Sequence, residues 1–283
     1  MLSTDKNYAS TIFICLILLV SCESDKKNET KRRVEDTTIE VKSHDQNLNI
    51  SLFLDVSDRI SPSKHPNKTM QFYERDLGYI KSVAERFRSH IIHKKIFKIN
   101  DQIQVYLDPI PENHKINKII EELKVGLNRD NVSKEMIDSI DYKYYAKCEK
   151  LYQSAIEDDN YIGSDIWGFF KRKVHDYCIS DNHRNILVII TDGYAYHKDN
   201  AFTKDNKSSY LLSRLIAKNK LIDPEWEQRF DRENFGFITE VKNLNNLEVL
   251  VLGINSYKKT PFEEDVIRKY WSEWLTDMGV KRL

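Results

Sequence analysis

Three solid runs of apolar residues, each closed by short polar residues, constrain the fold of this 283-residue chain more than any other feature. They read LNISLFLDV from Leu48, NILVIITDG from Asn185 and LEVLVLGIN from Leu247. Continuous apolar runs, in contrast to alternating ones, are typical of strands that are covered on both faces. Between these runs lie segments whose apolar residues recur with the period of an α-helix. The pattern therefore predicts an α/β fold with a doubly wound, mostly parallel sheet and helices on both faces.

The segments between these strands can be assigned from periodicity and breakers. A helix is expected around residues 73–87, and another over residues 134–156. DQIQVYLDP from Asp101 predicts a further strand, with KIFKI just before it as a candidate hairpin partner. We expect Gly163 to break the helical text and Ser164 to cap a new helix. YAYHKDNAFTKDNK is predicted to be a long surface loop, with helical text from Ser208 and again near Phe235, and a last helix opened by Pro261.

The amino terminus has the features of a targeting segment. Its apolar run TIFICLILLV is too short for a comfortable transmembrane helix and ends in Leu19-Val20-Ser21-Cys22. This ending resembles the lipobox of a bacterial lipoprotein signal peptide, with an uncleaved anchor or a chance cysteine as the alternative. The resemblance implies a signal peptide over residues 1–21, lipidation of Cys22 and a polar tether over residues 22–46.

The tether and its lipid imply a location. A chain that carries two or more acyl groups on Cys22 is stably membrane-attached. The Ser24-Asp25 pair partly resembles the surface-export signal of Bacteroidetes lipoproteins. We therefore expect a lipid-anchored protein of the cell envelope, on the periplasmic or outer face of the outer membrane.

Charge and cysteine content narrow the partner classes. Lys plus Arg and Asp plus Glu both number 44, which argues against a partner bound by bulk charge, such as nucleic acid or an anionic membrane surface. Cys148 and Cys178 remain after the signal segment and Cys22 are set aside. They are either a disulfide or two buried thiols, and spacing alone does not decide between these.

Three polar loops follow in chain order, and two of them close predicted strands. They read DVS from Asp55, GSD from Gly163 and TDG from Thr191. The set resembles the von Willebrand factor A domain and its metal-ion-dependent adhesion site, over roughly residues 48–280. The domain would then occupy residues 47–283.

The resemblance implies a cation site. Its metal ligands would be Asp55, Ser57, Ser164 and Asp192, around Mg²⁺ or another divalent cation, since hard dications prefer oxygen ligands. One coordination position would stay open for an acidic side chain of a protein partner. The implied function is a protein-binding, adhesion or assembly module, not an enzyme.

The first loop departs from the family pattern at Arg59, where the family has a second serine. Arginine cannot ligate a cation and stays protonated. If its head points inward it can pair with Asp55 or Asp192 in place of a metal. If it points outward, Asp58 or Ser61 can supply the missing ligand.

Two other functions remain as alternatives at the level of sequence. In one, the chain is a metal-free structural lipoprotein in which Arg59 neutralises the acidic loops. In the other, Asp55 serves a metal-dependent phosphohydrolase. The second is weakened because such enzymes place another Asp two residues on, where this chain has Ser57, and no phosphate-binding glycine loop, nucleophile elbow or zinc signature is present.

Overall fold

The computed structural model describes residues 46–161, 163–256 and 260–282. Within the chain, His44–Leu283 forms one compact unit. The predicted signal peptide, the lipidation of Cys22 and all but the end of the tether lie outside the described residues. No helix in the described ranges is long and apolar enough to cross a membrane.

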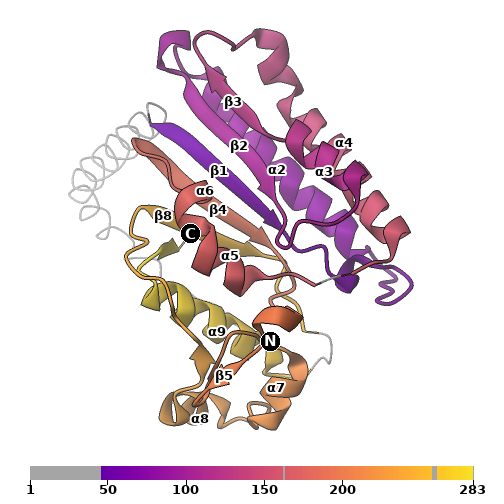
Figure 1. Cartoon of the computed structure of the whole chain (residues 1–283), viewed down its shortest axis with the longest axis vertical. Coiled ribbons are helices and arrows are strands. Elements are labelled where there is room, and N and C mark those ends of the chain that lie inside the picture. The colour runs from indigo at the N-terminus through magenta and orange to yellow at the C-terminus, as the bar shows by residue number, and fades with distance from the viewer. Residues whose placement is uncertain (1–45, 162, 257–259, 283) are drawn as a thin grey trace, which may run out of the picture. The chain divides into compact units, whose positions relative to one another are not determined.

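The core of the molecule is a sheet with the strand order β3-β2-β1-β4-β8-β9 (Figure 1). Every neighbouring pair is parallel except β2 and β3, which are antiparallel. The mixed, mostly parallel sheet confirms the predicted fold class. Its strands are β1 (Asn47–Leu54), β2 (Asn100–Tyr106), β3 (Val125–Asn128), β4 (His183–Ile190), β8 (Leu247–Leu252) and β9 (Lys281–Arg282).

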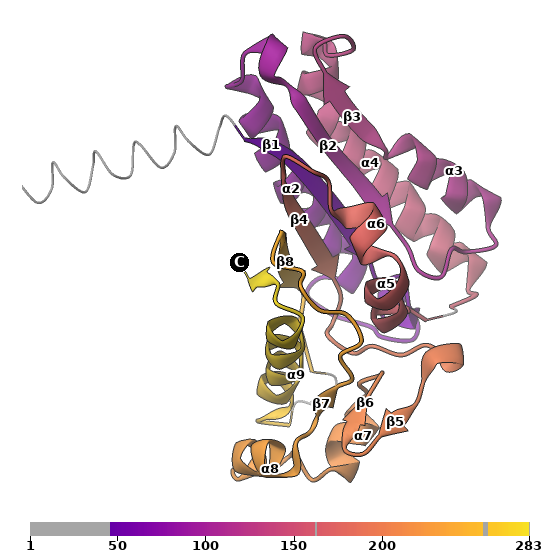
Figure 2. The same ribbon diagram turned by 60° about the vertical axis from the view of Figure 1, so that its left-hand side comes forward.

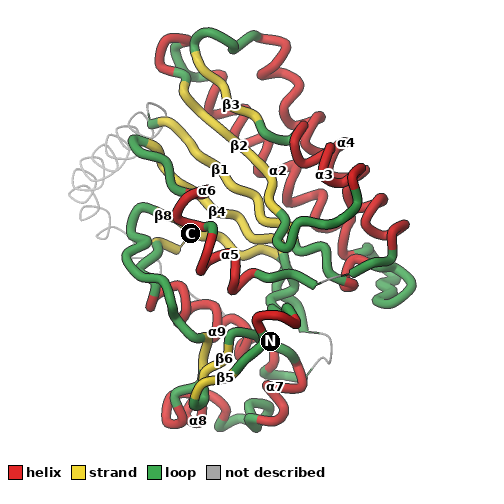
Figure 3. Tube along the Cα trace, in the orientation of Figure 1, coloured by secondary structure: helices red, strands yellow, loops and turns green. Residues whose placement is uncertain are grey.

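Helices pack on both faces of this sheet (Figures 2 and 3). One face carries α2 (Phe72–Ile92), α3 (His114–Glu122) and α4 (Lys134–Asp158). The other carries α5 (Ile166–Arg172), α6 (Val174–Cys178) and α9 (Glu263–Asp277). Each face has its own hydrophobic core, and the central strands supply both.

Strand β1 shows why its apolar run is continuous. Leu52 and Leu54 point into the core with α2 and α4, whereas Phe53 points into the opposite core. Because successive side chains of a strand alternate between faces, a strand buried on both sides needs apolar residues at almost every position.

A second, three-stranded sheet of very short strands lies within residues 203–237. It orders β5 (Thr203–Lys204), β6 (Lys207–Ser208) and β7 (Gly236–Phe237), with α7 (Ser213–Lys218) and α8 (Trp226–Glu233) between β6 and β7. The expected surface loop after β4 is therefore partly ordered into strands. The helical text expected near Phe235 is wrong, since Phe235 precedes β7.

Two further local predictions are wrong. KIFKI does not pair as a hairpin with β2; it forms the 3-10 helix η2 (Ile96–Lys98), and β2 pairs with β3 instead. Ser164 does not cap the next helix. The side chain of Asp165 does so by accepting the Gly168 N–H at 2.9 Å.

The two cysteines of the domain are both free and buried. Cys148 belongs to the core on the α2–α4 face, and Cys178 belongs to the core on the other face. The sheet separates them, so the alternative of two buried thiols is the correct one. Burial raises the pKa of the Cys178 thiol to about 12, against a small lowering by the Ser51 hydroxyl.

Candidate functional site

The predicted site lies at the carboxyl ends of β1 and β4, which are neighbours in the sheet. The chain leaves β1 toward β2 on one side, and it leaves β4 toward β8 on the other. In α/β folds, ligands bind outside the carboxyl ends of the strands at such a point of divergence. Register pairs Leu54 with Ile190, and the Asp55 N–H continues the ladder by donating to the Ile190 carbonyl at 3.0 Å.

Asp55 is buried at this edge, and both of its carboxylate oxygens are engaged. Its Oδ1 accepts the Ser57 N–H at 3.0 Å, and its Oδ2 accepts the Thr191 hydroxyl at 2.8 Å. The first bond lies within the first loop, and the bond from Thr191 joins the first loop to the third. Sequence reasoning therefore placed Asp55 and the Thr191-Asp192 loop together correctly.

The Arg59 side chain points inward. It belongs to the short 3-10 helix η1 (Asp58–Ile60) and is only 1% exposed. Its Nε lies 3.3 Å from Asp55 Oδ2, and its Nη2 donates to the Asp55 and Ile190 carbonyls at 3.0 and 3.2 Å. The guanidinium thus bridges the ends of β1 and β4.

A second carboxylate, from Asp76 on α2, completes the arginine's environment. Arg59 Nη2 donates to Asp76 Oδ2 at 2.5 Å, and the Tyr152 hydroxyl on α4 donates to the same oxygen at 3.2 Å. Asp76 was not predicted as a site residue. One sequence signal could have found it: Asp76 lies on the apolar face of α2, one position before Leu77, where a charge needs a buried partner.

The electrostatics follow from this arrangement. Burial on its own would lower the pKa of Arg59, but the carboxylates of Asp76, Asp55 and Asp192 outweigh it and raise the pKa well above the ordinary value. The Tyr152 phenol has a raised pKa, first because it is buried and next because Asp76 is close. The edge therefore holds one fixed positive charge among several acids.

Ser57 lies in the first loop, after β1, and Asp192 lies in the third loop, after β4. Asp192 is 3% exposed; its Oδ1 accepts the Tyr194 N–H at 3.0 Å, and its backbone carbonyl accepts the Asn255 N–H at 3.0 Å. Ser57 precedes η1 and makes no capping bond with its side chain. Gly193, at φ +96°, turns the chain away from the edge, and a Cβ there would collide with the Ile267 side chain.

The second loop is held differently. Ser164 forms an isolated antiparallel bridge with Tyr196, and its buried hydroxyl makes no hydrogen bond within the described part of the chain. Its neighbour Asp165 pairs with Arg172 at 2.6 Å as well as capping α5. No hydrogen bond therefore joins the Ser164 hydroxyl to the other three predicted ligands in the described ranges.

These residues do not fit a dication well. A metal at Asp55 would have to displace the Thr191 and Arg59 contacts, and it would meet the guanidinium charge at close range. Among the four predicted ligands, the buried Ser164 hydroxyl makes no hydrogen bond within the described residues, and a ligand could satisfy it. The described residues contain no cluster of three or more His, Cys, Asp or Glu side chains that could hold a metal ion.

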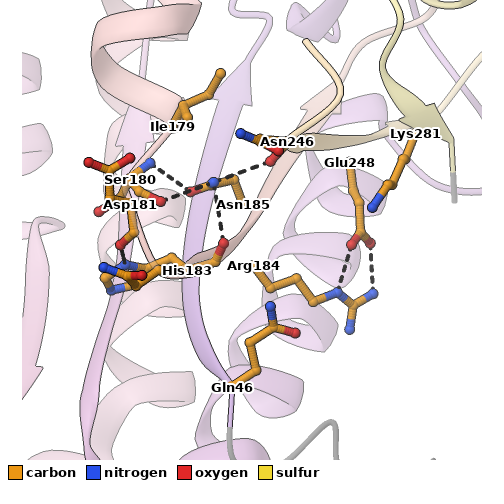
Figure 4. A pocket seen from close by; sticks show the side chains of 11 residues that line it. Gln46, Ile179, Ser180, Asp181, His183, Arg184, Asn185, Asn246, Glu248 and Lys281 are labelled. Atoms are coloured by element: carbon orange, nitrogen blue, oxygen red, sulfur yellow. Dashed lines mark hydrogen bonds and ion pairs between the residues drawn. The ribbon is translucent and has the colours of Figure 1, made fainter.

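A polar cavity of about 450 Å³ lies at the other edge of the sheet, around the starts of β4 and β8 (Figure 4). Arg184 and Glu248 cross it with two bonds of 2.9 and 2.7 Å. The Asn185 amide bonds to the Ser180 carbonyl at 3.2 Å and to the Asn246 carbonyl at 3.2 Å. These polar groups form hydrogen bonds and an ion pair with one another. We therefore assign them a structural role, which is to join the starts of β4 and β8.

Comparison with known proteins adds no family to this description. No protein-family model matches the chain, and no curated protein matches it. The chain is an α/β domain with a mostly parallel sheet flanked by helices.

Proposed function

We propose that this chain is a lipid-anchored envelope protein whose domain is a protein-binding module of the von Willebrand A type, with Arg59 in place of the cation. The support for the family is the order of its three loops and the place of two of them, after β1 and β4 at the point where strand order reverses. Binding of a partner would occur at the same edge.

The position of Arg59 is the observation that carries the proposal. A cation at this edge would hold the loops together by drawing oxygen atoms from each. Arg59 instead holds the loops together through its contacts with Asp55, Asp76 and the Ile190 carbonyl. Its charge is buried, and the two carboxylates balance it. The edge is in this way organised without a metal.

The state of Asp55 favours a binding module over a phosphohydrolase. A nucleophilic or metal-bound carboxylate must be reachable by the substrate, yet Asp55 is 1% exposed and both of its oxygens already accept hydrogen bonds. The position two residues after Asp55, where such enzymes carry their second acid, is Ser57.

Exposed apolar side chains at this edge support a protein partner. Met70 precedes α2, Ile110 follows β2 and Tyr196 follows β4; they are 52, 65 and 38% exposed. Large apolar and aromatic side chains on loops are typical of the contact surfaces of proteins.

Thermal unfolding with and without a dication tests the role of Arg59. We expect millimolar Mg²⁺, Mn²⁺ or a chelator to leave the melting temperature of the wild-type protein unchanged. A functional metal site at a hundredfold excess of cation would instead stabilise the fold by about 2.7 kcal/mol. That corresponds to a rise of roughly 5–10 °C for a domain of this size, and such a rise would refute the cation-free proposal.

Two arginine variants sharpen the same experiment. Arg59→Ser restores the family's serine and leaves two buried acids without their cation, so we expect a loss of about 3–5 kcal/mol, partly recovered by Mg²⁺. Arg88→Ser is the matched control, because Arg88 pairs with Asp138 in a partly exposed position. It should cost about 1 kcal/mol or less and gain nothing from the cation.

A further inference from the structure

Residues 86–98 form a segment that is rich in basic residues and has several apolar side chains exposed to solvent. Between Glu85 and Asp101 the sequence contains five Lys or Arg residues and no acid. This segment covers the end of α2 and the 3-10 helix η2. Arg88 pairs with Asp138 and Lys94 pairs with Asp101, so the local excess of positive charge is smaller than this count. The excess still contrasts with the net charge of zero over the whole chain.

Three large apolar side chains project from this segment. Ile92 is 47% exposed, Ile96 is 65% exposed and Phe97 is 69% exposed. Lys95 lies over the Phe97 ring at 6.0 Å, so a charged group and an aromatic ring are presented together. Apolar and aromatic tips among basic groups are the pattern of surfaces that lie on anionic bilayers.

The segment is fixed beside the point where the chain enters the sheet. Lys94 Nζ donates to Asp101 Oδ2 at 2.6 Å and to Asn47 Oδ1 at 2.7 Å, and the Leu48 N–H donates to Asp101 Oδ1 at 2.7 Å. His90 Nε2 bonds to the Gln46 carbonyl at 2.9 Å. Figures 1 and 2 both place the end of α2 next to the start of β1.

We propose that residues 86–98 form a docking patch for an anionic phospholipid bilayer, with Ile96 and Phe97 entering the headgroup region and with Lys95 and Lys98 contacting lipid phosphates. The patch needs only weak affinity, because this proposal rests on the lipid anchor at Cys22 to bring the domain to the membrane. Gln46, whose carbonyl bonds to His90 of the patch, follows Cys22 by 24 residues in the sequence.

Docking through this patch would orient the domain. Helix α2 has 21 residues and runs from the Asp76 end to the patch, a length of about 30 Å. The edge with Arg59 would therefore face away from the bilayer, open to a partner.

Vesicle co-sedimentation tests the patch without the anchor. The protein used is residues 23–283, which lacks Cys22 but keeps the whole compact unit His44–Leu283 and both of its hydrophobic cores. We expect binding to vesicles of phosphatidylcholine with phosphatidylglycerol, weaker binding at high salt, and little binding to phosphatidylcholine alone.

Paired variants separate the apolar and the charged contributions. Ile96→Ser with Phe97→Ser should weaken binding about tenfold or more, and Lys95→Glu with Lys98→Glu should do so as well. Ile110→Ser is the apolar control, because Ile110 is as exposed as Ile96 but lies after the other end of β2. Lys68→Glu with Lys115→Glu is the charge control.

A probe at the patch reports contact directly. Phe97→Cys can be labelled selectively in this protein, because both other cysteines are buried. An environment-sensitive dye there should shift to the blue on anionic vesicles, whereas the dye on Ile110→Cys should not. Absence of vesicle binding, equal binding by the patch variants, or a patch that instead mediates self-association in sedimentation would each overturn the membrane proposal. None of these outcomes bears on the cation test of Arg59.

Discussion

At the scale of single residues, the notable group is a wholly buried arginine whose charge is matched by two aspartates. Burying an ion is costly unless partners and hydrogen bonds replace water. Asp76 meets this requirement from α2, and Asp55 meets it from the end of β1. Through these two acids Arg59 links the end of β1 to α2.

Asp76→Asn tests this link. The variant keeps the size of the side chain but removes the charge that faces Arg59, and it should destabilise the fold by about 3–5 kcal/mol. The free energy of unfolding from urea titration measures the loss. Asp138→Asn is the control, because its arginine partner is on the surface, and it should cost about 1 kcal/mol or less. Equal losses in the two variants would mean that Asp76 is not the arginine's main counter-ion.

At the scale of elements, a strand could be predicted from the sequence only if it was long enough to show a pattern. The runs that became β1, β4 and β8 were found because buried strands need apolar residues on both faces. The strands β3, β5, β6, β7 and β9 were missed because two to four residues carry no measurable period, and their pairing is set by tertiary contacts.

The candidate site was predicted in the same uneven way. Asp55 and Asp192 were placed correctly because they close long strands. The inward direction of Arg59 was left open, since it depends on Asp76, which is distant in the sequence. Ser164 was expected to cap α5, but Asp165 offers a stronger acceptor one residue later.

The junction of α2, β1 and β2 makes a prediction about pH. Burial favours a higher pKa for Asp101, but bonds from His90, Lys94 and the Leu48 N–H outweigh it and lower the pKa. A carboxylate with a depressed pKa stabilises the fold above its unfolded pKa of about 3.9 and loses this contribution as pH falls through the lower folded value.

Asp101→Asn should therefore destabilise the domain by about 3–5 kcal/mol at neutral pH, because Lys94 is left buried without its partner. The gap between variant and wild type should narrow as pH falls below about 4. Urea unfolding across that range measures both. A gap that stays constant down to the acid limit would show that the charge of Asp101 is not the source of the stability.

At the scale of the whole domain, the sheet has two ends with different surfaces. The carboxyl edge carries the Arg59 cluster and exposed apolar residues on loops, and the other end carries the basic patch of residues 86–98. The two proposals assign a protein partner to the first end and a bilayer to the second.

Site-specific crosslinking in cells tests that assignment for the partner. A photoreactive amino acid at Met70 or Ile110 should give a discrete protein adduct. The same group at Tyr142, which is 76% exposed on α4, should not. Adducts from Tyr142 alone would move the binding surface to the helical face and contradict the proposed edge.

The place of β1 in the sheet has a mechanical consequence for a chain held at its amino terminus. Gln46 leads directly into the strand that has β2 on one side and β4 on the other, both parallel to it. A pull on the amino-terminal segment along that strand would load both ladders in shear, together with the bond from Leu48 to Asp101. Under shear, many backbone hydrogen bonds must break at once. Tension at the amino terminus would therefore be resisted by a central strand of the sheet, and not by an edge strand whose hydrogen bonds can break one by one.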